Sequence, residues 1–382
     1  MMFKLEGAIN EGARVDSIDI PCYGSHSHRL IDDLEEACKF LFDRDIKVSL
    51  TENDQERLFE DDESHASHLS EGYTCLFSIG LDSYSGILNA RKHLANVCGA
   101  FVSHADQKNL LPLLDKFQLG PFNESGLHVR VIDADSHGDG MRRFRGIFYI
   151  LNGLTLGNRN IIVCEVGPTM YQVPFTVLDD ITVTAHPKAL EFAHKIAYDV
   201  LGTEIRILTP NEDLTKAEVA ATCRLDRFVK KTVSCSRTSF ANSEAPNCGT
   251  CYPCIVRRLG VLVAGAQDSR YRYNFAGNIK HMGAYDNIVQ LIRFSIDFLK
   301  YPEHVPWYTL NIPRTYGKLE LFRRFALDNL AGLKVLAEQT YMSVPLTKLH
   351  TLASDVISKE CLEDRIASVR GNEFKPNLGN WK

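Results

Sequence analysis

The stretch YTCLFSIGLDSYSGIL, residues 73–88, decides the fold. Residues 73–79 form an apolar run of strand length, and the residues after them predict a helix over about 83–96. The loop from Ser78 to Ser83 joins the two. A strand that enters a helix through such a loop presents backbone N–H groups and a helix dipole to an anion. The same pattern also fits a plain helix cap. The stretch therefore predicts an α/β fold with this loop as a candidate anion site.

Strands and helices alternate after this stretch. Further strands are expected at 99–104, 127–135, 160–167 and 204–208, and helices at 107–117, 143–156 and 187–201. This alternation predicts a doubly wound parallel sheet with helices on both faces. Ligands of such sheets bind at the carboxyl ends of the strands. The polar segment after the third strand therefore offers candidate substrate contacts, namely Asp133, Asp135, His137 and Arg143.

Four parts are expected along the chain. Residues 1–52 predict a small α+β domain, with strands at 15–21 and 46–50 around an amphipathic helix at 30–45. Residues 53–71 are polar without an apolar period and predict a linker, and residues 72–274 hold the α/β domain. Residues 275–382 predict a helical extension that serves as an appendage or a partner platform, with helices at 286–300, 318–337 and 349–369.

Composition and charge exclude several function classes. The chain of 382 residues is 45% hydrophobic and 24% charged, which indicates a globular protein of more than one domain. A net charge of -5 argues against direct nucleic-acid binding, and no apolar run is long enough to span a membrane. The first residues lack the hydrophobic region of a secretory signal, and eleven cysteines fit a reducing compartment. We therefore expect a cytoplasmic protein.

Four cysteines lie in one short segment, 235–254. Cys235 precedes the CxxCxxC run of Cys248, Cys251 and Cys254 by twelve residues. Thiolates at this spacing are typical of a metal site. Four thiolates complete a tetrahedral Zn²⁺ site without an open position, which predicts a structural role. An iron–sulfur cluster takes the same ligands and remains the alternative, followed by four buried thiols without metal.

Four stretches in sequence order resemble one family. SIGLDS at 78–83 is similar to the SGGxDS phosphate loop of the PP-loop ATP pyrophosphatases, whose fold is of the HUP type. The segments 144–167, 208–223 and 234–257 resemble one branch of it, the 7-cyano-7-deazaguanine synthases or QueC-like proteins. They are FRGIFYILNGLTLGNRNIIVCEVG, LTPNEDLTKAEVAATC and a cysteine segment that ends in Arg257. The resemblance covers about residues 72–266.

The resemblance implies the site residues. By this resemblance, the residues that bind ATP are Ser78, Gly80, Leu81, Asp82 and Ser83. The catalytic residues are Asp82, Lys216 and Arg145, with Mg²⁺ bound beside the phosphates. Each side chain also has an ordinary interpretation: Lys216 and Arg145 as solvated helix residues, and Asp82 as an acid that stabilises the first helical turn. One position departs from the family, because Ile79 replaces a glycine. If that position needs a positive φ, a β-branched residue there is strained.

The part before the loop resembles, in arrangement, the N-terminal part of QueC-like proteins from anti-phage defence operons, the QatC-like branch. This resemblance implies an AMP-forming carbon–nitrogen ligase. It would activate a 7-deazaguanine-type carboxylate with ATP, release pyrophosphate and transfer the acyl group to a nitrogen, on a partner protein from the same operon. Two alternatives stay open: the 7-cyano-7-deazaguanine synthase of queuosine biosynthesis, and a non-catalytic nucleotide-binding scaffold.

Overall fold

The fold is taken from a computed structural model. It describes residues 15–22, 28–52, 69–103, 105–133, 144–171, 184–274, 282–304, 316–339, 342, 344–375 and 377. The linker residues 53–68 and the candidate contacts Asp135, His137 and Arg143 lie outside the described residues.

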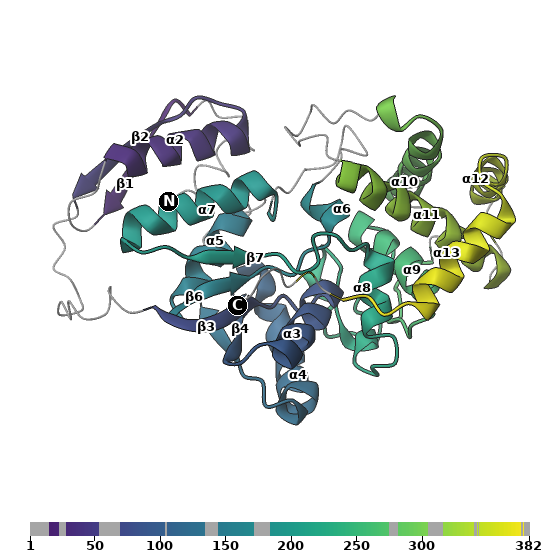
Figure 1. Cartoon of the computed structure of the whole chain (residues 1–382), viewed down its shortest axis with the longest axis horizontal. Helices are drawn as coiled ribbons and strands as arrows, with labels where there is room; N and C mark the ends of the chain where they lie inside the picture. The colour runs from purple at the N-terminus through teal and green to yellow at the C-terminus, as the bar shows by residue number, and fades with distance from the viewer. Residues whose placement is uncertain are drawn as a thin grey trace.

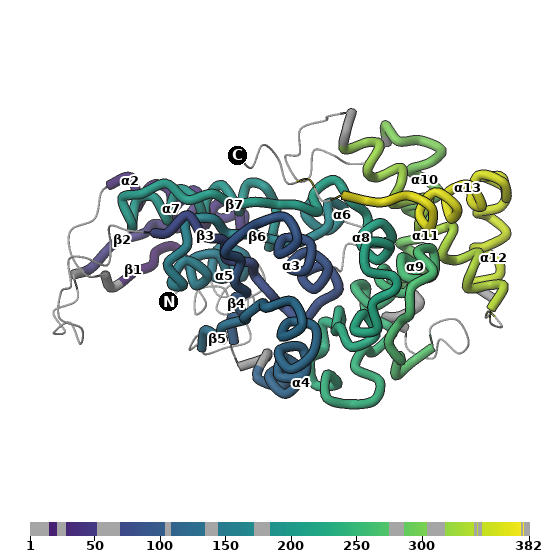
Figure 2. Tube along the Cα trace, turned by 60° about the horizontal axis from the view of Figure 1, so that its bottom comes forward, coloured from purple at the N-terminus to yellow at the C-terminus, as the bar shows by residue number. Residues whose placement is uncertain are grey.

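Five parallel strands form the central sheet, in the order β5-β4-β3-β6-β7 (Figure 1; β5 is labelled in Figure 2). They are β3 Ser70–Leu76, β4 Val97–Ser103, β5 Val129–Asp133, β6 Asn158–Ile162 and β7 Arg206–Leu208. The predicted parallel α/β sheet is confirmed. Chain order reverses between β3 and β6, which are hydrogen-bonded neighbours in the register Cys75↔Ile162. In a doubly wound sheet this reversal opens the ligand-binding crevice at the carboxyl ends of the two strands.

Helices cover both faces of the sheet (Figure 1). On one face lie α3 Leu81–His93 and α4 Leu111–Phe117, and on the other lie α5 Arg145–Leu154 and α7 Pro187–Leu201. The short connecting elements are η1 Ala105–Leu110, η2 Gln118–Phe122 and α6 Gly167–Met170. The core under α3 is aromatic, because Phe77 meets Phe122 edge-on with ring centroids 5.0 Å apart and Tyr84 meets Phe117 at 5.2 Å. This packing fixes the start of α3 relative to β3.

The N-terminal part is a βαβ unit. The strands β1 Ser17–Cys22 and β2 Lys47–Glu52 pair in parallel, and α2 His28–Phe42 joins them. The predicted strand, amphipathic helix and strand are confirmed. The apolar face of α2 is buried, with Leu30, Leu34, Ala37, Leu41 and Phe42. In both views α2 lies beside α7 (Figure 1, Figure 2). Lys195 of α7 faces Asp33 and Glu36 of α2 at 3.8 and 3.6 Å.

The helices after the sheet pack as one group (Figure 2). They are α8 Lys216–Thr222, α9 Tyr252–Ala264, α10 Met282–Lys300, α11 Tyr316–Gln339, α12 Val344–Ser354 and α13 Lys359–Gly371, with short turns η3 Val229–Lys231, η4 Thr238–Phe240 and η5 Pro302–His304. The single helix predicted over 349–369 is wrong. Helix α12 ends at Ser354. The Ser358 hydroxyl accepts a hydrogen bond from Cys361 N and thereby caps the next helix, α13. A serine that bonds nearby backbone N–H groups favours a helix start over a helix interior.

Candidate functional site

The phosphate-loop candidate lies at the carboxyl end of β3, at the point where chain order reverses. Ser83 is buried, and its hydroxyl accepts from Ser78 N (3.2 Å) and donates to Gly80 O (3.1 Å). Ser78 is exposed, with its hydroxyl 3.2 Å from that of Ser83. Leu81 begins α3 with a fully buried side chain, so only its backbone N–H can serve a ligand. Ser83 therefore braces the loop, while Ser78 is free to meet an anion.

Ile79 adopts the conformation that the glycine of the family would allow. Its φ is +63°, in the left-handed region that β-branched residues avoid. The side chain is 0% exposed and belongs to the main hydrophobic core. The strain expected at this position is thus present, and burial offsets it. Because the side chain is fully inside the core, it covers none of the loop's solvent-accessible surface.

Two of the three predicted catalytic residues meet at this loop. Lys216, the first residue of α8, forms an ion pair with Asp82 Oδ2. The two side chains are only 11% and 12% exposed, so water screens the pair little. Asp82 Oδ1 is buried and has no hydrogen-bond partner among the described residues. The carboxyl group of Asp82 also lies close to a further ionisable group.

That group is Glu165, which the sequence analysis did not single out. It follows β6 by three residues, on the other side of the reversal point, and its Oε1 accepts from Val166 N (3.4 Å). Desolvation, and next the charge of Asp82, raises the pKa of Glu165 to about 7, while Lys216 opposes the shift. Perturbed carboxyl groups in a cleft are typical of functional sites. The available signal was its place after an apolar strand, as Ser78 is placed after β3.

Arg145 lies elsewhere. It begins α5, and its guanidinium donates to Thr184 Oγ1 (3.4 Å) just before α7. Its Nε is buried without a hydrogen-bond partner among the described residues. Gly146 explains how closely the two segments approach, since a Cβ there would lie 1.6 Å from Thr184 O. The structure therefore brings Asp82 and Lys216 together and gives Arg145 separate surroundings. Asp133, at the end of β5, is exposed.

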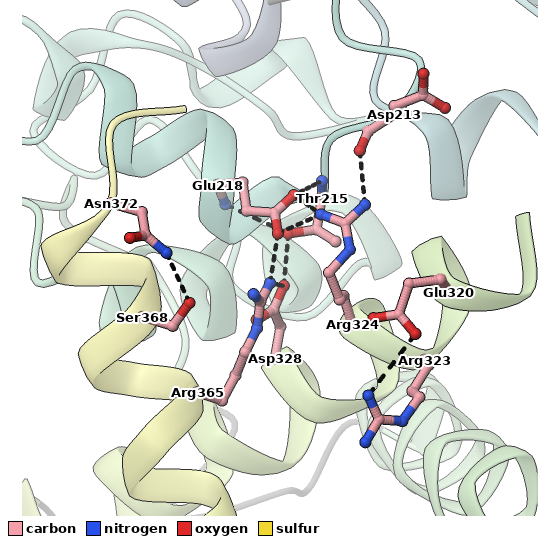
Figure 3. Close-up of polar contacts among 10 residues, drawn as sticks. All are labelled: Asp213, Thr215, Glu218, Glu320, Arg323, Arg324, Asp328, Arg365, Ser368 and Asn372. Carbon is pink, nitrogen blue, oxygen red and sulfur yellow. Dashed lines mark hydrogen bonds and ion pairs between the residues drawn. The ribbon is translucent and has the colours of Figure 1, made fainter. Parts of the chain in front are cut away.

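The residues beside Lys216 in the TKAE motif have structural contacts. Thr215 caps α8 by accepting from Glu218 N, and the Glu218 carboxylate accepts in return from Thr215 N (3.0 Å). Glu218 is fully buried and binds the guanidinium groups of Arg324 and Arg365 (Figure 3). The motif thus sets the position of the α8 N-terminus, from which Lys216 projects.

The four predicted metal ligands converge. The Sγ atoms of Cys235, Cys248, Cys251 and Cys254 all lie within 4.8 Å of one another. The Cys248–Cys254 and Cys235–Cys251 sulfur pairs are each 3.9 Å apart. Sulfurs at about 2.3 Å from one tetrahedral Zn²⁺ lie about 3.8 Å apart. In an iron–sulfur cluster the four cysteines are shared among two or four irons, so sulfurs bound to different irons lie further apart. The spacing therefore fits a single tetrahedral ion, for which zinc is the matching metal.

Backbone donors surround these sulfurs. Cys235 Sγ accepts from Cys248 N (3.4 Å) and from Arg237 N (3.3 Å), and Cys248 Sγ accepts from Thr250 N and Cys251 N, both at 3.3 Å. Such hydrogen bonds favour the thiolate form and orient the ligands. The donor set is therefore built for anionic sulfur around a closed metal site.

The residues just before the cysteine segment hold the loop after β3. Val233 N, two residues before Cys235, donates to Ile79 O (2.9 Å). Arg257, fully buried in α9, donates to Thr232 O (3.1 Å) and Val229 O (2.9 Å), and pairs with Asp268 (2.9 Å). The metal segment, the segment 229–233 and the loop after β3 are thus connected by direct contacts.

A comparison with family models now bears on this geometry. The model described as "Queuosine biosynthesis protein QueC" matches residues 180–265. The match supports a QueC-like family. It contains α8 with Lys216 and all four cysteines, whereas the phosphate loop lies outside it. The QueC-like match fits a PP-loop fold and indicates ATP-dependent, nucleotide-related synthase chemistry. No curated protein sequence matches the chain. None of the described helices is both long and apolar enough to cross a membrane.

Proposed function

We propose that the protein is an ATP-dependent, AMP-forming carbon–nitrogen ligase that acts in the cytoplasm on a 7-deazaguanine-type carboxylate. The observation that carries the proposal is the meeting of Asp82, Lys216 and Glu165 beside the loop after β3. These residues come from three separate chain segments, and they meet at the reversal point of the sheet, where doubly wound folds bind ligands. A purely structural ion pair needs no third carboxyl group with a raised pKa.

The proposed reaction has two steps. First, a carboxylate oxygen of the substrate attacks the α-phosphorus of ATP, and the bond to the β-phosphate oxygen breaks. The exposed Ser78 hydroxyl and loop N–H groups hold the departing pyrophosphate, and the Lys216 ammonium group stabilises the developing negative charge. Arg145, with its unpartnered Nε, is the candidate to bind a substrate anion.

In the second step, an amine nitrogen attacks the acyl carbon, and the bond to AMP breaks. The attacking nitrogen must lose a proton. Glu165 is suited to accept it, because a pKa of about 7 makes a carboxylate an effective base near neutral pH.

The carboxyl group of Asp82 is the candidate ligand for Mg²⁺. Its Oδ1 is buried and has no hydrogen-bond donor among the described residues. Mg²⁺ prefers such oxygen ligands and keeps phosphate oxygens and water in its other positions. When bound, it neutralises phosphate charge.

A pyrophosphate-release assay with ATP and 7-carboxy-7-deazaguanine tests this proposal. We expect release that depends on the carboxylate and falls at least about a hundredfold in Lys216→Met, by analogy with the loss of one electrostatic contact to a transition state. Lys92→Met, at the exposed end of α3, is the matched control and should retain wild-type activity. Absence of carboxylate-dependent pyrophosphate from the wild-type protein would refute the enzyme proposal.

We further propose that the nitrogen acceptor belongs to a partner protein from the same operon, in an anti-phage defence system. The parts outside residues 72–266, which the QueC-like resemblance does not cover, support this extension. Intact-mass measurement of a co-expressed neighbour protein tests it. An added mass on the neighbour supports conjugation, whereas free 7-cyano-7-deazaguanine alone supports the nitrile synthase of queuosine biosynthesis.

A non-catalytic nucleotide-binding scaffold is favoured by one observation, the strained Ile79 where the family loop has glycine. The assay above distinguishes it. A scaffold binds ATP in calorimetry but releases no pyrophosphate with any carboxylate.

A further inference from the structure

The C-terminal helices reach the first turn of α8, which carries Lys216, through a buried ionic network (Figure 3). We propose that Arg324 of α11 and Arg365 of α13 are positioning residues for Lys216. The inference rests on the proposed function, in which the Lys216 ammonium group acts on ATP. It assigns the helical extension a part in catalysis itself, separate from any part in binding a partner.

The first support is the geometry around Glu218. Its two carboxylate oxygens accept hydrogen bonds from Thr215 N and from the guanidinium groups of Arg324 and Arg365. Arg365 Nη2 lies 2.7 Å from Oε1. Arg324 also donates to Asp213 O (2.9 Å), the residue two before the cap. The first turn of α8 is therefore held by α11 and α13 at its side chains and at its incoming backbone.

The second support is Asp328, which extends the network to the cap itself. Its Oδ2 accepts from the Thr215 hydroxyl (2.5 Å), and Arg365 binds both of its oxygens at 2.7 and 3.1 Å. Arg365 therefore connects Glu218 and Asp328, and through them holds the N-cap residue Thr215 and the third helical residue at once. Lys216 lies between these two positions, so a rotation of the helix start would displace its ammonium group from Asp82.

The network is balanced in charge as well as directed in geometry. Two buried carboxylates, Glu218 and Asp328, meet two guanidinium groups, so the charges cancel. Burial raises the pKa of Asp328 to about 6, and the charge of Arg365 opposes the shift. Apolar residues often stabilise a fold as well as buried ion pairs do. What apolar residues cannot supply is a directed hold on both ends of one helical turn.

Close packing gives a third, independent support. A Cβ on Gly332 of α11 would lie 2.7 Å from Leu259 O of α9, and a Cβ on Gly260 of α9 would lie 3.1 Å from Lys216 Cγ. The aliphatic part of Lys216 thus rests on α9, and α9 rests directly on α11. The lysine is set from the same helices by packing as well as by charge.

Arg365→Lys tests the inference, because lysine keeps the charge but cannot bridge both carboxylates with a fixed fork. We expect kcat for pyrophosphate release to fall by about tenfold to a hundredfold, the scale of a small misplacement of a catalytic group. The KM for ATP should change much less. Arg323→Lys is the matched control, since Arg323 lies beside Arg324 and, among the described residues, pairs with Glu320 alone at the surface. It should behave as wild type.

A double variant separates positioning from loss of structure. If Arg365 acts through Lys216, then adding Arg365→Lys to Lys216→Met should leave the residual rate unchanged. A further tenfold loss in that background would overturn the inference. If Arg365→Lys proves unstable, Asp328→Asn, which keeps the shape of the side chain, replaces it in the same comparison. A wild-type protein that releases no pyrophosphate would refute the proposed function. An active wild type with an unaffected Arg365→Lys variant would refute only the positioning role.

Discussion

Ile79 provides a prediction in which the usual ranking of two substitutions is reversed. At an ordinary helix or strand position, alanine is more stable than glycine by about 0.5–1 kcal/mol. At Ile79 the backbone is held at φ +63° by its place between β3 and α3 and by the hydrogen bond from Val233 N to Ile79 O (2.9 Å). An L-residue in that conformation is strained by about 1–2 kcal/mol, and glycine is not.

The magnitudes follow from burial and backbone together. Both Ile79→Ala and Ile79→Gly remove a side chain that is 0% exposed, which costs about 2–5 kcal/mol in either variant. Glycine additionally relieves about 1–2 kcal/mol of strain and loses about 0.5–1 kcal/mol in chain entropy. Ile79→Gly should therefore be the more stable of the two by about 0.5–1 kcal/mol, although both are less stable than the wild type.

Urea unfolding followed by circular dichroism, at matched protein concentration, measures the difference. The control is the same pair of substitutions at Arg323, an exposed position inside α11. There the free energy of unfolding of the alanine variant should exceed that of the glycine variant by about 1 kcal/mol. If Ile79→Ala is as stable as Ile79→Gly or more stable, the loop is not held at positive φ and the strain argument fails. A wild-type protein less stable than Ile79→Gly would show instead that strain outweighs burial.

Three further results are expected. Activity should rise as pH increases through about 7, because Glu165 must lose its proton to act as a base; Glu165→Gln should remove this dependence in a pH–rate profile, and an unchanged profile refutes the role. Because the pKa of Glu165 is raised in the folded state, its contribution to stability is complete below the ordinary carboxyl pKa and is lost as the pH rises through about 7. Glu165→Gln should therefore be more stable than the wild type above that pH. Elemental analysis should find one zinc per chain in the wild type. Cys251→Ser should lose both the zinc and affinity for ATP, because Val233, two residues before Cys235, bonds the loop after β3. Brown absorbance from iron would contradict the zinc assignment.

Local patterns in the sequence were sufficient to predict the sheet, the loop after its first strand and the gathering of four cysteines. Apolar runs of strand length and helices between them determine a parallel sheet, because each element must bury one face. The cysteine spacing brings four sulfurs together without reference to the rest of the fold. The helix over 187–201 and the βαβ character of the N-terminal part follow from apolar periodicity in the same way.

The order of strands in the sheet was outside the reach of these patterns, and so was Glu165. Its neighbour Asp82 is more than eighty positions away, and the two meet only because β3 and β6 are adjacent. Arg365 was missed for a related reason. Its partner Glu218 lies on a helix 147 positions earlier, and no periodicity in α13 identifies which arginine faces inward. Contacts between distant segments depend on tertiary packing, which local preferences do not encode.

One helix connects the two centres that the sequence treats as separate. Cys254, Arg257 and Gly260 follow one another at three-residue spacing in α9, so each neighbours the next around the helix. The first is one of the four predicted metal ligands, the second holds the segment whose Val233 bonds the loop after β3, and the third packs on Lys216. A metal ion bound by these cysteines would therefore fix the start of α9 and, through it, both sides of the proposed nucleotide site. Loss of metal should consequently lower kcat as well as stability, and restoring zinc should restore both together.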